Sequence, residues 1–253
     1  MFLQKQRTVI IGAALVVALV LLFALFFVPG ADTPGVQLAD PGSGEGTGDG
    51  LSLHPAIGVE ITTENVQAVI ATLTRTEAYA REIRQTHYWD GGQRSGTRTA
   101  EIFRTPEALR ISWDTRENMV ITAEHYHLWF GTGAVITRPV AGLGESLDQI
   151  LDEFQGVPSY EAVLELDPTQ IIRAGYAQLD IGGALRAVIY LTVETGTRGY
   201  IDTYYICLAT GLLVEMTTFD GDVPVYRFET LHLSIEPPVA SDFLLPDGTD
   251  PLD

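Results

Sequence analysis

The chain has 253 residues, of which 46% are hydrophobic and 19% are charged, and its formal net charge is −18. This composition is enough for one substantial core, so it excludes a wholly disordered protein. The strong negative charge repels phosphate backbones and anionic lipid headgroups, and the sequence therefore predicts no nucleic-acid partner.

The first predicted element is an uncharged apolar run from Thr8 to Val28. At a rise of 1.5 Å per residue, about 20 residues cross a hydrocarbon core of about 30 Å. Lys5 and Arg7 precede the run and Asp32 follows it, which favours a cytoplasmic N-terminus. The alternative is a cleaved signal peptide, whose apolar region is usually shorter and ends in a better cleavage site. We expect residues 1–29 to be a cytoplasmic stub and a single-pass anchor in the cell membrane.

Residues 30–55 are rich in Gly, Pro, Asp and Ser and have no sustained apolar period. This composition is typical of a flexible acidic linker. The acidic residues lack the spacing of a calcium-binding loop. The linker is therefore expected to lead into one extracytoplasmic domain over residues 56–253.

Two helical segments are predicted in this domain. In residues 62–73 the apolar positions recur at i, i+3, i+4 and i+7, namely Val66, Val69, Ile70 and Leu73. Thr62 or Thr63 is the expected N-cap, with Glu64 in the first turn. Residues 145–154 repeat the pattern with Leu147, Ile150, Leu151 and Phe154, and residues 159–166 are an ambiguous segment that could extend this helix.

Short segments with a period of two fill most of the remaining domain. Those typical of strands are residues 79–90, 97–105, 108–115, 118–124, 125–131, 134–140, 184–194, 200–208, 212–219 and 223–235. The last four form an expected antiparallel meander, in which Gly211 supplies a turn. The predicted fold class is α+β: a curved antiparallel sheet with helices covering one face.

Several strands carry large apolar side chains on both faces. Tyr204 and Ile206 alternate with Tyr205 and Cys207, for example. Such a sheet is either covered on both faces or leaves an apolar surface for a ligand or partner, and the sequence leaves both alternatives open. The candidate residues for an apolar ligand cavity are Trp113, Leu128, Phe130, Ile189, Leu191, Tyr205 and Phe228.

Catalytic patterns are weak. His125 and His127 share a face of one predicted strand, but no third zinc ligand is evident, so a packed or solvated pair is the preferred interpretation. The single cysteine, Cys207, lies in an apolar run and is expected to be a buried, unreactive thiol. The sequence therefore predicts no enzyme, no cofactor and no metal site.

The last strands and the tail match loose structural motifs over Tyr204 to Val214, over Tyr226 to Phe228, and at Pro238, Phe243, Pro246 and Gly248. With the helix and long strand that open the domain, these motifs resemble the LolA-like superfamily of lipoprotein carriers and RseB-type sensors. The resemblance spans nearly all of residues 57–250. Ala209 departs from it, because the superfamily pattern often has an aspartate there.

The resemblance implies a half-barrel whose concave face, covered by helices, binds acyl chains or apolar protein segments. It also implies that Phe243 is inserted against the sheet and that Pro246 to Gly248 turn the chain away. The first functional hypothesis is a membrane-anchored binding protein for a lipid or a lipoprotein acyl chain. The alternative is a regulatory subunit of the cell envelope that binds a protein and no lipid.

Overall fold

The computed structural model describes residues 58–140, 160–196 and 199–252. These residues belong to a compact unit that extends from Ser52 to Asp253. The predicted anchor, the linker and the predicted helix at 145–154 lie outside the described residues. Within the described ranges, no helix has the length and apolar character needed to cross a membrane.

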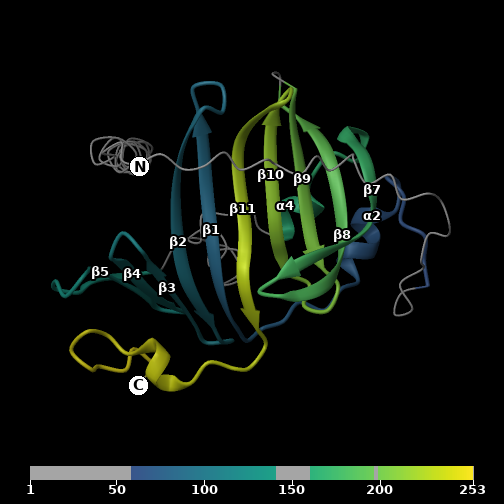
Figure 1. The fold of residues 1–253 in the computed structure, drawn as a ribbon. Helices are drawn as coiled ribbons and strands as arrows, with labels where there is room; N and C mark the ends of the chain where they lie inside the picture. The colour runs from purple at the N-terminus through teal and green to yellow at the C-terminus, as the bar shows by residue number, and fades with distance from the viewer. Residues whose placement is uncertain (1–57, 141–159, 197–198, 253) are drawn as a thin grey trace, which may run out of the picture. The chain divides into compact units, whose positions relative to one another are not determined.

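Eleven antiparallel strands form one curved sheet (Figure 1). The strands are β1 (Tyr79–Trp89), β2 (Arg94–Arg104), β3 (Ala108–Trp113), β4 (Glu117–Thr122), β5 (His125–Phe130), β6 (Ile136–Pro139), β7 (Ile171–Ile181), β8 (Ala184–Thr195), β9 (Tyr200–Cys207), β10 (Leu213–Asp220) and β11 (Val223–Ser234). The strands β1 to β6 form one meander, and β7 to β11 form a second. The two meanders join where β1 pairs with β11.

Strand β7 was not predicted from the sequence. Its apolar alternation is interrupted by Gly175, and its pairing with β8 shifts between Ile171 and Arg173. Such an irregularity breaks the period of two on which a strand prediction depends. The other ten strands fall in the predicted segments, with ends that differ by a few residues.

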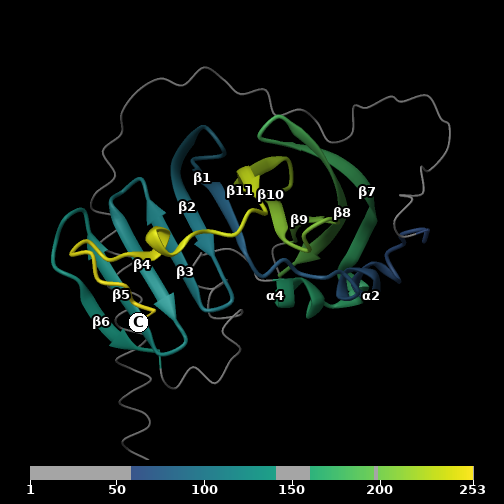
Figure 2. The same ribbon diagram turned by 90° about the horizontal axis from the view of Figure 1, so that it is seen from below.

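Two short helices lie on one face of the second meander (Figures 1 and 2). They are α2 (Val66–Ala71) and α4 (Tyr160–Leu164), so part of the ambiguous segment 159–166 is helical. The Gln67 amide nitrogen joins them by donating to the carbonyl oxygens of Val163 and Leu166, at 3.1 and 2.8 Å.

The predicted cap of α2 is wrong. Asn65 occupies the N-cap, and the first turn contains no acidic residue. The Asn65 side chain accepts from the Thr62 backbone N–H and donates to the Glu60 carbonyl, both at 2.8 Å. These local bonds hold the preceding residues in a turn, so the helix begins later than its apolar period suggests.

The strand register divides the side chains between two faces. We call one the helix face, because Ile83, Leu191 and Phe228 point from it into the same buried core as Val66 and Ile70 of α2. We call the opposite one the threonine face, after the row that contains Thr86, Thr203 and Thr217. The alternation that the sequence showed is therefore confirmed, although the threonine face also contributes the buried Val188 and Cys207 to this core.

The tail confirms the prediction made from the superfamily motifs. A 3-10 helix, η2 (Ala240–Phe243), packs on β3, and the Phe243 side chain is 1% exposed. The Arg110 guanidinium donates to the Asp242 carbonyl oxygen at 2.7 Å. Beyond it, the Gly248 N–H donates to the Leu245 carbonyl oxygen, which closes the predicted turn. The tail lies across β3 to β5 in Figure 2.

We expect Phe243→Ala to destabilise the protein by about 3 kcal/mol or more, because it removes a buried aromatic side chain and leaves a cavity. Denaturant unfolding measures the change. Leu252→Ala is the matched control, since this tail residue is 41% exposed, and it should change stability by less than about 0.5 kcal/mol. Equal effects of the two substitutions would contradict the placement of the tail.

The β9–β10 turn needs glycine at position 211 for two reasons. Gly211 has φ +65°, and a Cβ there would lie 2.9 Å from the Thr74 carbonyl oxygen. Gly211→Ala should therefore cost about 3 kcal/mol of unfolding free energy, through backbone strain and a clash with rigid main chain. Gly221→Ala is the control, because Gly221 has φ +60° but no atom within 4 Å, and it should cost only about 1 kcal/mol. Thermal unfolding of both variants tests the difference.

Candidate functional site

Six of the seven predicted cavity residues lie on the helix face, and Tyr205 lies on the threonine face. On the helix face the side chains differ in exposure. Those in the buried core are Trp113, Ile189, Leu191 and Phe228. Leu128 is half-buried, and Phe130 is 58% exposed at the end of β5.

Phe130 belongs to an apolar edge patch on the helix face, which we define as Leu128, Phe130 and Ile136. Leu128 of β5 pairs with Ile136 of β6, which is 45% exposed. From this patch an apolar row continues across neighbouring strands to Met119 and then to the buried Ile111. Apolar surface therefore extends without interruption from the sheet edge to the core.

A polar cluster interrupts the helix face between β1 and β3. The Arg98 guanidinium carbon lies 3.9 Å from the centre of the Trp113 ring, and Arg98 Nε donates to Gln85 Oε1 at 2.8 Å. Burial, and to a lesser degree the Arg98 charge, lower the pKa of His87. Trp113 is therefore fixed by a cation–π contact as well as by its apolar surroundings.

The threonine face carries two polar rows that run from strand to strand. Register partners in the first row are Thr97, Thr86, Arg227, Thr217, Thr203 and Thr192, from β2 to β8. Those in the second row are Thr99, Arg84, Glu229, Glu215, Tyr205, Tyr190 and Gly175, from β2 to β7. The two rows are two residues apart on each strand, so they share one face.

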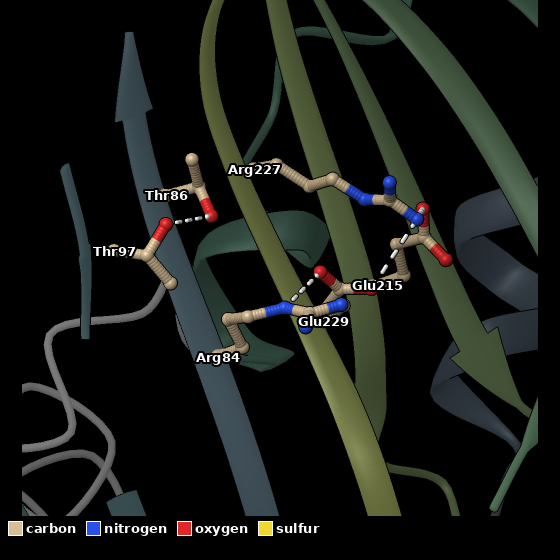
Figure 3. Close-up of polar contacts among 6 residues, drawn as sticks. All are labelled: Arg84, Thr86, Thr97, Glu215, Arg227 and Glu229. Atoms are coloured by element: carbon tan, nitrogen blue, oxygen red, sulfur yellow. Dashed lines mark hydrogen bonds and ion pairs between the residues drawn. The ribbon is translucent and has the colours of Figure 1, made fainter. Parts of the chain in front are cut away.

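Ion pairs link the centre of these rows (Figure 3). Arg84 Nε lies 2.7 Å from Glu229 Oε1. The guanidinium of Arg227 lies between the two carboxylates, 3.1 Å from Glu215 and 3.4 Å from Glu229. The side chains of Glu215 and Glu229 are only 18% and 15% exposed, so these pairs are more shielded than ordinary surface pairs.

The sheet itself provides this shielding. The tip of the β7–β8 hairpin returns to β11, although three strands lie between β7 and β11 in the sheet (Figure 1). A Cβ on Gly182 at the tip would lie 3.2 Å from the Leu231 carbonyl oxygen. Arg186, a residue of the threonine face, donates to the Leu233 carbonyl oxygen at 3.4 Å. The sheet therefore rolls toward the threonine face between β7 and β11, so α2 and α4 lie on the convex side of this part of the sheet, whereas helices were expected on the concave face (Figures 1 and 2).

Two tyrosines continue the second row beside the ion pairs. The ring centres of Tyr190 and Tyr205 lie 6.3 Å apart, with 39° between the ring planes. Gly175 leaves room for the Tyr190 ring, because a Cβ there would lie 3.1 Å from the Tyr190 hydroxyl oxygen. The tyrosines thus form an aromatic pair next to Glu215.

Histidine and cysteine chemistry gives no comparable site. The rings of His125 and His127 lie 6.1 Å apart, and His127 Nδ1 lies within hydrogen-bond distance of Thr137 Oγ1. Among the described residues, no group of three His, Cys, Asp or Glu side chains could hold a metal ion. Cys207 is fully buried in the core, as predicted.

Comparison with known proteins gives structural similarity only. No protein-family model and no curated protein matches the chain. Similar solved structures include MucB in complex with MucA(peri), at 16% identity and a TM-score of 0.37, with 71% of this chain and 57% of the MucB chain covered. A LolA superfamily protein from Nitrosomonas europaea matches at 4% identity and a TM-score of 0.33, with 73% and 98% covered.

A protein of the DUF1329 family from Desulfovibrio piger matches at 9% identity and a TM-score of 0.33, with 72% of this chain and 95% of that chain covered. The similar structures thus include the superfamily that the C-terminal motifs resemble. At such low identities and TM-scores, no ligand or partner is transferred from these proteins to this chain.

The pKa of the Glu215 carboxyl group provides a direct test of the ion pairs in the second row. Burial raises its pKa above the ordinary value, while the Arg227 charge acts in the opposite direction. Since the folded state binds this proton more readily than the unfolded state, Glu215 reduces stability at neutral pH. This cost is relieved as the pH falls through the raised pKa toward the ordinary value.

We expect Arg227→Met to raise the pKa of Glu215 further, because it removes the neighbouring positive charge and its hydrogen bond. Carbon-detected NMR titration of the carboxyl group measures the shift. Arg94→Met, at the exposed start of β2, should leave it unchanged. A lower or unchanged Glu215 pKa in Arg227→Met would contradict the observed pairing.

Proposed function

We propose that this chain is a non-catalytic, extracytoplasmic binding protein that holds an acyl chain of a lipid or lipoprotein against its helix face. One observation supports this most strongly: the apolar row from the exposed Ile136 through Leu128 and Met119 to the buried Ile111. An acyl chain would enter over the apolar edge patch and follow this row. Phe130 would cover it at the entrance, and Trp113, Ile189, Leu191 and Phe228 would bound the apolar region further inside.

Removal of apolar area from water would supply the binding energy. Each methylene group transferred from water contributes about 0.8 kcal/mol, from which the cost of association is subtracted. The predicted Thr8–Val28 anchor would keep the domain close to its source of acyl chains. Because the chain has a net charge of −18, anionic headgroups would add little attraction.

A second candidate function has its own supporting observation. All four residues of the edge strand β6 are exposed, and an exposed edge strand can pair with a strand from another protein. The chain would then be a regulatory subunit of the cell envelope that binds a protein and no lipid.

Photocrosslinking with a diazirine-labelled palmitate in native membranes can separate these functions. We expect the full-length chain to be labelled at β5, β6 or neighbouring residues of the helix face. Phe130→Asp should reduce labelling about tenfold or more, because it places a charge at the proposed entrance. Leu185→Asp is the control, since Leu185 is 72% exposed at the start of β8, far along the sheet from β5.

Equal labelling of wild type, Phe130→Asp and Leu185→Asp would reject the acyl site. Recovery of one stoichiometric protein crosslinked to β6, with no labelling by palmitate, would favour the regulatory function instead.

A further inference from the structure

We infer that the threonine face between β7 and β11 binds a neutral, polyhydroxylated chain, that is, a glycan. This site is separate from the proposed acyl site, since the two lie on opposite faces of the sheet. It is formed by Tyr190, Tyr205, Glu215, Arg227 and Glu229, with threonines of the first row beside them.

The charges of this face favour a neutral ligand. Arg84 and Arg227 pair with Glu215 and Glu229, so the group has no net charge although the whole chain is strongly acidic. An ionic ligand would leave one charge of this half-buried group without a counter-charge, which is costly. An acyl chain would remove the same groups from water without replacing their hydrogen bonds.

The polar atoms of this face that lack a hydrogen-bond partner are suited to bind the hydroxyl groups of a ligand. Arg227 donates to Glu215 Oε1, and Glu215 Oε2 has no hydrogen-bond partner among the described residues. The hydroxyls of Tyr190, Tyr205 and Thr217 also make no hydrogen bond within that part of the chain, and all three residues are half-buried. A sugar hydroxyl both donates and accepts, so it can satisfy a carboxylate oxygen and a neighbouring side-chain hydroxyl together.

One buried donor of this group lacks a hydrogen-bond partner. Arg227 Nε is buried and has no partner among the described residues, while the terminal nitrogen of the same guanidinium contacts both carboxylates. A buried donor without a partner costs free energy, and other buried polar atoms of the described residues, such as Tyr226 Oη on the helix face, also lack one. Because Arg227 Nε is itself inaccessible, a ligand would be held by the half-buried Glu215, Tyr190 and Tyr205 instead.

The Tyr190–Tyr205 pair offers an apolar surface on which a sugar ring could stack. Sugar rings present C–H groups on their faces, and tyrosine rings combine an apolar surface with a polar end. The Tyr190 ring is held over Gly175, and Tyr205 adjoins Glu215 in the second row. A sugar ring stacked on the tyrosines would therefore direct its hydroxyls at the carboxylates and threonines.

Isothermal titration of the full-length chain in phosphatidylcholine nanodiscs tests this inference, with no sugar detergent present. The probes are maltohexaose, cellohexaose and the hexamer of N-acetylglucosamine. We expect at least one of them to bind, and Tyr205→Ala to weaken its affinity about tenfold or more through loss of the stacking ring. Glu215→Gln, which keeps the side-chain shape, should weaken affinity about threefold or more by removing the charged acceptor.

The control is Phe130→Asp on the opposite face, which should leave hexasaccharide affinity unchanged while it reduces palmitate labelling. Tyr205→Ala should have the reverse pattern, so failure of either site can be distinguished from failure of the other. If Tyr205→Ala does not fold, Glu215→Gln alone tests the site. Absence of binding to all three probes, or binding that neither Tyr205 nor Glu215 substitutions affect, would overturn the inference.

Discussion

The pairing of β1 with β11 is the interaction on which the rest of the structure depends. It joins the first strand of one meander to the last strand of the other, so segments far apart in the sequence form one sheet. A slip of one residue in this register would move every side chain of one meander to the opposite face. The Arg84–Glu229 ion pair, which joins β1 to β11, helps to fix this register on the threonine face.

A consequence of this register is that an apolar surface and a polar, charged surface lie on opposite faces of the same sheet. The helix face buries apolar side chains under α2, and its apolar row reaches the surface at Ile136. On the threonine face, Glu215 and Glu229 are shielded by the roll of the sheet but keep cationic partners. Half-buried charges add little net stability compared with apolar packing.

The sequence predicted the strands well where alternation was regular, and it predicted the insertion of Phe243. It did not predict β7, because Gly175 and a register shift break the period, or the Asn65 cap, because local side-chain bonds outweigh an apolar pattern. Arg227 and Glu229 lie on one side of β11, as a period of two requires. Their partners could not be found, because cross-strand neighbours depend on register, which one strand's periodicity does not contain.

Native-state hydrogen exchange tests the central claim most directly, because it reports whether the two meanders open together. A single sheet held by the β1–β11 pairing predicts that the hydrogen-bonded amides around Thr86 and Phe228 exchange only through global unfolding, with the same free energy. Exchange of β1 to β6 at a distinctly lower free energy, while β7 to β11 stay protected, would contradict it.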